Sequence, residues 1–335
     1  MSSKKSPTHS NQYRNKRVLV TGGLGFIGSN LAIRLVELGA KVTILDSMID
    51  DYGGNFFNIA PVKNKVTVNI SDMRDKYGIN YLVRDQDIIF NLAGQLSHID
   101  SMTDPYADLE INCTAQLSLL EAVRHHNPKA VVVLTSTRQI YGKPQYLPVD
   151  EQHPISPVDV NGINTAAGEW YHTLYHNVYG LKTVSLRLTN TFGPRQLMKH
   201  NRQGFIPFFI RLLIEGKTIN LFGDGKQVRD INDVDDVVSA LLLSGTKPAA
   251  IGQVYNLGGE PISLLDLTKL MIKVNGKGKY TLTPFPPEKK RIDIGDYYGD
   301  YTKIKTELGW KPRITLVDAV RRTFAYYRKN RKYYW

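Results

Sequence analysis

The sequence has a single cysteine, Cys113, among 335 residues, and it has no hydrophobic run close to the length of a membrane span. One cysteine excludes an intrachain disulfide and favours a reducing compartment. A bilayer span needs about 18 consecutive apolar residues, and the polar segment before Arg17 lacks the hydrophobic core of a secretory signal. Without a second cysteine or a cluster of histidines, we expect no metal site. The sequence therefore predicts a cytoplasmic protein with no membrane association.

Acidic residues are too few to balance the basic ones, since 43 Lys and Arg face 31 Asp and Glu and leave a net charge of +12. Eleven of these positive charges lie in residues 1–17 and 321–335, which contain no acidic residue. Because the rest of the chain is nearly neutral, the charge does not mark a basic groove on a folded domain. We expect a flexible basic tail at residues 1–15 and a basic aromatic tail at residues 326–335. This distribution disfavours a nucleic-acid partner.

Short β-branched runs alternate with helical patterns from Arg17 to about Thr189. This alternation is typical of a parallel sheet with crossover helices. The runs are mostly apolar, as expected when helices cover both faces of the sheet. One more strand is expected at Gln253–Leu257. The six earlier runs are Val18–Thr21, Val42–Leu45, Val66–Ile70, Ile88–Leu92, Val131–Thr135 and Thr183–Leu188.

A glycine motif, Thr21–Gly28 with the sequence TGGLGFIG, directly follows the first strand and begins the first helix. This is the context in which such a motif binds a dinucleotide. Gly22 permits the tight turn, Gly25 lets backbone N–H groups approach the pyrophosphate, and Gly28 allows close packing of helix on strand. The helix N-terminus adds partial positive charge for the diphosphate. The residues expected to contact the cofactor here are Gly22, Gly25, Phe26, Ile27 and Gly28.

Asp46 ends the second run, 18 residues after Gly28. A carboxylate at this place accepts hydrogen bonds from the adenosine ribose hydroxyls and repels a 2′-phosphate, which favours NAD over NADP. The third and fourth runs end in residues that would lie beside the adenine and beside the passing dinucleotide. These residues are Asp72, Met73, Leu92, Ala93 and Gly94.

Proline and glycine break the chain into shorter elements after Asn190. The predicted fold is α/β: a Rossmann-type doubly wound parallel sheet with a smaller C-terminal α/β substrate-binding cap. We assign residues 16–190 to the NAD-binding domain, with residues 228–259 returning to it. The cap takes residues 191–227 and 260–325, and we expect a ligand cleft between the two parts.

Several motifs in this order resemble the extended short-chain dehydrogenase/reductase family, and most of all its NAD-dependent nucleotide-sugar epimerases and dehydratases of the UDP-glucose 4-epimerase type. The resemblance covers nearly all of residues 16–320. It implies NAD as cofactor and a nucleoside-diphosphate sugar as substrate. Besides the glycine motif, it rests on residues within Asn91–Gly94, Ser136–Gly142, Arg187–Pro194, Phe222–Asp236 and Leu308–Pro312.

In that family a Tyr-x-x-x-Lys pair and a nearby Ser or Thr move the protons of the sugar while the cofactor takes and returns a hydride. Thr137 matches the Ser/Thr position. Gly162 and Glu169 fix the register of the tyrosine stretch, which places Asn161 at the Tyr and Thr165 at the Lys. An amide gives up no proton near neutral pH, and a threonine carries no charge, so neither residue repeats the family chemistry.

Other candidates for the proton chemistry are few. Tyr301 and Lys305 form another Tyr-x-x-x-Lys pair, but they lie in the predicted cap. Histidine is the residue type that titrates near neutrality, although a loop histidine is more often simply solvated. The candidates near the predicted cleft are His98, Asp100, Tyr141 and Glu169.

The 4,6-dehydratases of the family carry an Asp-Glu pair directly after the Thr, whereas this chain has Arg138 and Gln139. Neither side chain can act as a carboxylic acid or a carboxylate. The substitution disfavours elimination and leaves epimerisation, or simple oxidation and reduction at a sugar carbon.

For the substrate, the resemblance implies that Asn190 donates hydrogen bonds to the phosphates. It also implies that Arg229 and Arg291 bind the diphosphate through bidentate hydrogen bonds from their guanidinium groups. Phe205 would form a wall near the sugar or the base. In family dimers, helices matching Pro105–His125 and Asn161–Tyr179 pair into a four-helix bundle, so we expect a homodimer. Contributors to the bundle, or alternatively to the chain's own core, are Leu117, Leu120, Trp170 and Leu174.

Two functions stay open. The first is an NAD-dependent epimerase-like enzyme that acts on a nucleotide sugar with atypical catalytic residues. The second is a catalytically idle relative that binds NAD and a nucleotide sugar as a regulator or partner subunit. A chain altered at positions 161 and 165 would look the same in sequence.

Overall fold

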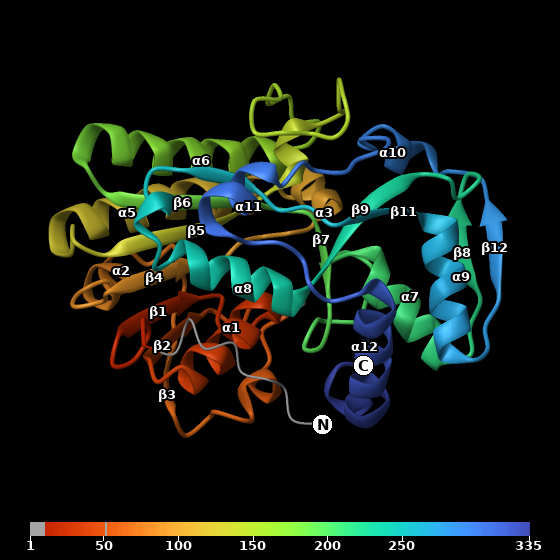
Figure 1. Ribbon diagram of the computed structural model, residues 1–335, viewed down its shortest axis with the longest axis horizontal. Coiled ribbons are helices and arrows are strands. Elements are labelled where there is room, and N and C mark those ends of the chain that lie inside the picture. Colours follow the sequence, from red (N-terminus) through yellow and green to blue (C-terminus); the bar gives the residue numbers. More distant parts are fainter. Residues whose placement is uncertain (1–10, 51) are drawn as a thin grey trace.

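A parallel sheet of seven strands forms the larger part of the computed structural model, which describes residues 11–50 and 52–335 (Figure 1). The strand order is β10-β6-β5-β4-β1-β2-β3, and every neighbouring pair is parallel. This order confirms the predicted Rossmann-type sheet, with the expected late strand added beside β6. The strands are β1 (Arg17–Thr21), β2 (Lys41–Asp46), β3 (Val66–Ile70), β4 (Ile88–Asn91), β5 (Val131–Thr137), β6 (Lys182–Leu188) and β10 (Val254–Asn256).

Helices cover both faces of the central strands of this sheet, which explains why those strands are mostly apolar, whereas the edge strand β3 is only partly buried. In β1, Val18 and Val20 belong to the core on one face, whereas Leu19 belongs to the core on the other. Successive residues of a strand point to opposite faces, so each face needs its own apolar side chains. The first face holds α1 (Phe26–Glu37), α8 (Val234–Ser244) and α11 (Thr302–Leu308), and the second holds α2 (Lys76–Leu82), α5 (Ala115–His126) and α6 (Val160–Tyr179).

A second group of elements forms the cap at the far side of Figure 1 from α5 and α6. One small sheet has the order β11-β9-β7, and another pairs β12 with β8. Residues 228–259 are predicted from the sequence to return to the dinucleotide-binding part. Residues 228–233 instead form β9 of the cap sheet, whereas α8 packs on the large sheet and β10 joins it as a strand. The cap elements are β7 (Asn190–Phe192), α7 (Phe205–Ile214), β8 (Ile219–Phe222), β9 (Val228–Asp233), β11 (Glu260–Ser263), α9 (Leu264–Asn275), β12 (Tyr280–Thr283), α10 (Pro287–Lys290) and α12 (Leu316–Asn330).

Short helical turns connect these layers and carry several residues of the cavity described below. A π-helical turn, η2, joins α4 to α5, so the expected helix from Pro105 is continuous but locally widened. No helix within the described ranges is long and apolar enough to cross a membrane. The short elements are η1 (Phe56–Ile59), α3 (His98–Thr103), α4 (Pro105–Leu109), η2 (Glu110–Thr114), η3 (Arg138–Tyr141), η4 (Pro248–Ala250) and η5 (Arg331–Tyr333).

The N-terminal segment is anchored at Tyr13, which corrects the described part of the tail predicted at residues 1–15. Tyr13 is fully buried, and its hydroxyl donates to the Leu242 carbonyl at 2.7 Å. The segment is held against the fold although its neighbouring residues are basic, because burying the Tyr13 ring removes a large apolar area from water. Residues 1–10 lie outside the described residues.

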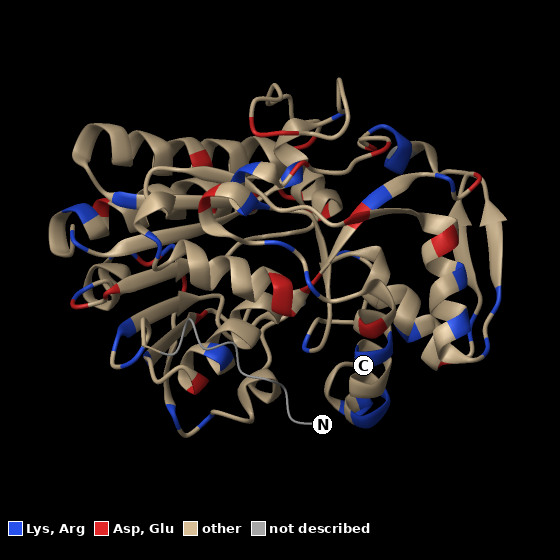
Figure 2. Cartoon of the chain, viewed as in Figure 1, with Lys and Arg blue, Asp and Glu red and all other residues tan. Residues whose placement is uncertain are grey.

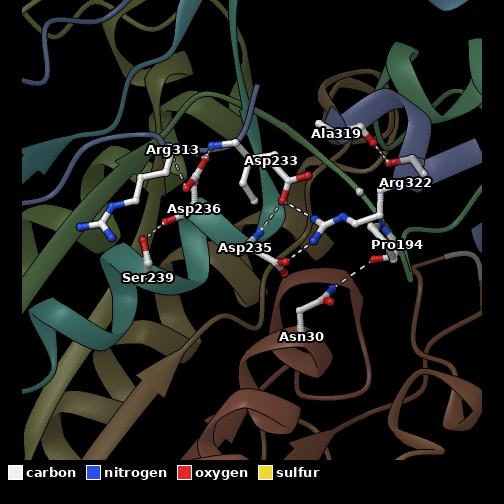
Figure 3. A network of polar contacts seen from close by, with 12 residues as sticks. Asn30, Pro194, Asp233, Asp235, Asp236, Ser239, Arg313, Ala319 and Arg322 are labelled. Carbon is white, nitrogen blue, oxygen red and sulfur yellow. Dashed lines mark hydrogen bonds and ion pairs between the residues drawn. The ribbon is translucent and has the colours of Figure 1, made fainter. Parts of the chain in front are cut away.

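The C-terminal segment is packed as well, although it carries many of the basic residues seen on α12 in Figure 2. Arg322 bridges the carboxylates of Asp233 and Asp235 at the start of α8 (Figure 3). Tyr334 is nearly buried, and its hydroxyl donates to Asn58 Oδ1 at 2.6 Å. Within the predicted tail at residues 326–335, Tyr327 and Tyr334 therefore belong to the cap core, which corrects the prediction of a tail.

The four residues expected in a helical bundle do not share one environment. Leu120 is fully buried in the chain's own core, and Leu117 is partly buried against it. Trp170 and Leu174, in contrast, are 56% and 48% exposed on α6. Only the α6 residues of this set therefore lie on an outward face.

A buried histidine on α6 makes the stability of this fold depend on pH. Burial lowers the pKa of His172 from 6.5 to about 4, and one ring nitrogen contacts the Gly168 carbonyl at 2.8 Å. Between these two values the unfolded chain binds a proton that the folded chain does not, so stability falls as the pH drops. The difference corresponds to roughly 3 kcal/mol.

We expect His172→Gln to reduce the loss of unfolding free energy between neutral pH and about pH 4.5. Denaturant titrations at the two pH values measure that loss. His126→Gln, at an exposed position of α5, is the matched control and should lose as much stability as the unchanged protein. An undiminished loss in His172→Gln would contradict the assignment.

Candidate functional site

A cavity of about 580 Å³ lies where the carboxyl ends of the central strands meet the cap. Ligands of doubly wound sheets bind at this edge. Every side chain and glycine predicted for the site lines this cavity, with the exception of Arg291, which is exposed and outside the lining. The residues brought together are Gly22, Gly25, Phe26, Ile27, Gly28, Asp46, Asp72, Met73, Leu92, Ala93, Gly94, Thr137, Asn161, Thr165, Asn190, Phe205 and Arg229.

The glycine turn between β1 and α1 has the close packing that a dinucleotide needs. Gly22 has a φ of +65°, which favours glycine. A Cβ added at Gly28 would overlap the Gly22 carbonyl oxygen, so a side chain there would push the helix away from the turn. No side chain caps the start of α1 and its first turn holds no acidic residue. Its N–H groups are therefore able to donate to a diphosphate, and the turn fits NAD.

Asp46 is held at the rim of the cavity by two backbone donors. Its carboxylate accepts from Leu24 N and from Met48 N, both at 3.0 Å. Burial raises its pKa, and these hydrogen bonds act against that rise. The fixed carboxylate is suited to accept from ribose hydroxyls.

Asp72 is less available than expected, because Arg74 pairs with it at 2.8 Å and reaches Glu110 at 2.9 Å. The hydrogen bonds from Arg74 hold the pKa of Asp72 below its usual value. This ion pair links the loop after β3 to η2 and shapes the wall of the cavity beside Met73.

Asn161, at the family's tyrosine position, is engaged as an amide donor. Its Nδ2 donates to the Gln95 carbonyl at 2.8 Å and to Asp108 Oδ2 at 3.0 Å. Asp108 is fully buried and also accepts from Asn112 Nδ2 at 3.1 Å and Asn164 Nδ2 at 2.8 Å. A buried carboxylate requires such donors. Asn161 therefore has a structural task that a base at this position would not perform.

Thr137 ends β5, and its hydroxyl accepts from Gln139 N at 3.2 Å, which caps η3. Thr165 lies one turn after Asn161 on α6 and lines the same cavity. The cavity thus offers a hydroxyl at the expected Ser/Thr position but no ammonium group at the lysine position.

Of the other candidates for the proton chemistry, two are buried away from the cavity. Tyr141 contacts Arg187 and Asn256, and Glu169 pairs with the same arginine at 2.6 Å. Asp100 pairs with Arg202 at 3.3 Å and does not line the cavity. The Tyr301–Lys305 stretch is also outside the lining.

His98 lines the cavity and has a carboxylate behind it. Its Nδ1 lies 3.0 Å from Oδ2 of Asp159, which is buried and caps α6 by accepting from Gly162 N at 2.7 Å. Although burial acts to raise the pKa of Asp159, the contacts with His98, Gly162 N and Gln139 hold it below its usual value. The Asp159 carboxylate therefore lies on the Nδ1 side of the ring. His98 is thus a partly exposed histidine at the cavity wall with a buried carboxylate beside it.

Sequence reasoning missed both Asp159 and Tyr52. An Asp directly before a helical pattern is a signal for a helix cap, and that signal was present for Asp159. Tyr52 also lines the cavity. Burial and the charges of nearby aspartates raise the pKa of Tyr52, so it keeps its proton and does not replace the family's tyrosine.

The cap contributes polar groups for the substrate side. Arg229 is 6% exposed and is held by the Val228 and Gly295 carbonyls, with Asp293 at 3.4 Å. Burial, followed by the charge of Arg138, lowers the pKa of Arg229 to about 10. The wall near Arg291 is formed by other residues of the same segment: Lys289, Ile292 and Asp293. Phe205 begins α7 at the opposite wall.

Residues 19–323 match the family described as GDP-mannose 4,6-dehydratase. The chain belongs to this family of extended short-chain dehydrogenases/reductases. A putative UDP-glucose 4-epimerase of Methanocaldococcus jannaschii is 34% identical over 321 residues, which cover 94% of this chain and 99% of the relative.

Two solved structures are similar over nearly the whole chain. UDP-glucose 4-epimerase of Thermotoga maritima, solved with UDP-glucose, has a TM-score of 0.85 at 30% identity and covers 94% of this chain and 99% of its own. dTDP-glucose 4,6-dehydratase of Streptomyces venezuelae, solved with NAD, has a TM-score of 0.86 at 29% identity. The match covers 95% of this chain and 98% of its own. Because epimerases and dehydratases both appear, family membership alone does not decide between the two reactions.

We expect Asp46→Asn to weaken NAD binding by roughly tenfold, since a charged acceptor of two ribose hydroxyls is lost. The same change should narrow the preference for NAD over NADP because a repulsive charge disappears. Equilibrium titration with both dinucleotides measures the two effects. Asp224→Asn, an exposed position outside the cavity lining, should alter neither affinity. An unchanged ratio of the two affinities in Asp46→Asn would exclude Asp46 as the selective group.

Proposed function

We propose that the chain binds NAD and a nucleoside-diphosphate sugar in this cavity and epimerises a sugar carbon with atypical catalytic residues. The observation that carries the proposal is the meeting of three groups of residues in one space: the glycine turn with Asp46, the hydroxyl of Thr137, and the polar pair Asn190 and Arg229. The NAD-bound and sugar-nucleotide-bound relatives support both ligands. When bound, NAD supplies an acceptor and donor of hydride at the sugar carbon.

The protein's own part is the transfer of the hydroxyl proton. We assign this task to His98, whose outward ring nitrogen takes the proton of the sugar hydroxyl during oxidation and returns it during reduction. Asp159, whose Oδ2 lies 3.0 Å from Nδ1, orients the ring. The Thr137 hydroxyl positions the sugar oxygen.

Elimination of water is disfavoured by the groups that follow Thr137. Arg138 and Gln139 stand where the dehydratases carry two acids, and Gln139 donates to Asp159 Oδ2 at 3.0 Å. Neither residue protonates a leaving hydroxyl. The assignment to epimerisation rests on this side-chain chemistry.

A catalytically idle, ligand-binding role is the second candidate. It is favoured by the tight engagement of Asn161 with Asp108 and by the uncharged Thr165. Such a protein would keep both ligands and lack the redox step. The following experiment separates the two functions.

NAD-loaded protein is mixed with UDP-, dTDP-, CDP- and GDP-sugars in single turnover, and the absorbance of NADH and the appearance of the epimer are followed. His98→Gln should slow both by roughly a hundredfold or more while ligand affinity is kept. Asp159→Asn should also slow both signals, but by less. Asn keeps the helix cap, although it removes the negative charge beside the ring of His98. His126→Gln is the control and should retain the full rate.

A full rate in His98→Gln would exclude His98 as the proton acceptor. Binding of several sugar nucleotides with no redox signal in the unchanged protein would instead favour the idle role. Loss of ligand affinity in His98→Gln would mean that the residue serves binding rather than proton transfer.

We also propose a homodimer formed through α6. Ile163, Trp170, Leu174 and Val178 are each about half exposed or more, and their spacing places them on one face of the helix. An apolar stripe of this kind is stable when a second copy covers it.

Trp170→Lys should convert the dimer to a monomer, because a charge at the centre of the stripe opposes burial. Light scattering coupled to size-exclusion chromatography measures the mass. Tyr77→Lys, at an exposed aromatic of α2, should leave the mass unchanged. A monomer before any substitution would overturn the proposed assembly.

A further inference from the structure

Arg138 is a shielded cation at the cavity wall with an unused donor. It follows Thr137 directly and begins η3. Its Nη2 donates to Asn190 Oδ1 at 3.1 Å, and its guanidinium lies 5.1 Å from the centre of the Tyr297 ring. Its Nη1 is closed off from solvent and has no hydrogen-bond partner among the residues that the structure describes. Arg138 itself lines the cavity.

The carboxylates in its neighbourhood are already engaged. Asp230 is fully buried and accepts from Gly299 N at 3.0 Å and from the Thr189 hydroxyl. Asp293 accepts from Gln227 at 2.8 Å and pairs with Arg229. Across the described ranges, no carboxylate forms an ion pair with Arg138.

The positive charge of Arg138 is buried and, in the described part of the chain, is not neutralised by an ion pair with a carboxylate. Burial lowers the pKa of Arg138 and thus works against its charge, and Arg229 adds a second cation nearby. Guanidinium does not lose its proton at physiological pH. Asn190 and Tyr297 contact the guanidinium, and the charges of Asp230 and Asp293 act to keep it protonated. No carboxylate of the described residues bonds to it directly, and an oxyanion that accepts from Nη1 would stabilise the desolvated charge further. The geometry therefore calls for an anion from the ligand.

We propose that Arg138 binds a carboxylate carried by the sugar, so that the substrate class is a nucleoside-diphosphate sugar acid. This inference rests on the proposed function. It follows from position, because Arg138 directly follows Thr137, the residue assigned to the sugar oxygen. The contact of Arg138 with Asn190, the residue assigned to the phosphates, makes the diphosphate the competing anion. Arg138 would recognise an oxyanion in either case, whether it belongs to a sugar carboxylate or to the diphosphate. The experiment therefore has to distinguish these two sources.

The experiment measures the affinities of UDP, UDP-glucose and UDP-glucuronate by calorimetry, together with the dTDP forms of all three. The unchanged protein should bind the glucuronate form most tightly. Arg138→Gln should weaken that form by about tenfold or more, as expected for a lost charge-assisted hydrogen bond. The neutral-sugar form and the free nucleotide should change by less than about twofold. Arg138→Lys keeps the charge without the fork and should fall between these limits.

Thermal unfolding without ligand provides a second readout. Removing an unpaired, desolvated charge should leave the melting temperature of Arg138→Gln equal to or above that of the unchanged protein. Glutamine keeps a donor for Asn190. A clearly lower melting temperature would indicate that Arg138 serves the fold instead, and it would overturn the inference.

The affinities give the other decisive outcomes. Equal losses for all ligands of a series, free nucleotide included, would assign Arg138 to the diphosphate and overturn the sugar-acid assignment. That assignment also fails if the unchanged protein binds UDP-glucose without any preference for UDP-glucuronate, and the proposed function would then survive. Failure of the unchanged protein to bind any of the six ligands would contradict the proposed function itself.

Discussion

The buried carboxylate of Asp108 constrains the chemistry of the whole site. It accepts from three amide nitrogens, and one of them belongs to Asn161 at the family's tyrosine position. A phenol at this position would sit beside a negative charge, which raises a tyrosine pKa, whereas the family's lysine lowers it. The carboxylate and a tyrosine base are therefore incompatible. With Asp108 in this place, the proposed proton transfer needs an acceptor on another wall, and His98 lines the cavity.

The sheet and the cofactor half of the site were predictable because their signals are local. Strand runs such as Val18–Thr21 are apolar at every position, and the structure shows why, since alternate residues serve different cores. Gly22 and Gly28 meet across one turn, so a short motif contains both partners of the contact. Asp46 ends the strand next to that turn. In each case the determining residues are close in sequence.

The proton-transfer half was not predictable in this way, because its contacts join distant segments. Asp108 and Asn161 lie 53 positions apart, and Tyr334 reaches Asn58 across 276 positions. No periodicity records such pairs, since they arise only when helices and sheets pack. Basic composition at the chain ends suggested solvated tails, but composition does not show which acidic groups will face Arg322. Arg291 was assigned by resemblance in a cap loop, where neighbouring residues form the wall instead.

The positive charge of the site lies at a different position from the one it has in the family pattern. The lysine position is the neutral Thr165, and the position that holds an acid in the dehydratases is the cationic Arg138. The cavity thus keeps a fixed positive charge, but from a group that cannot release a proton. Arg138 is suited to hold an anion and to favour negative charge on a nearby sugar oxygen, yet it cannot accept or donate the proton itself. Under the proposed function, electrostatic binding and proton transfer, which one Tyr-Lys pair combines in the family, are divided between Arg138 and His98.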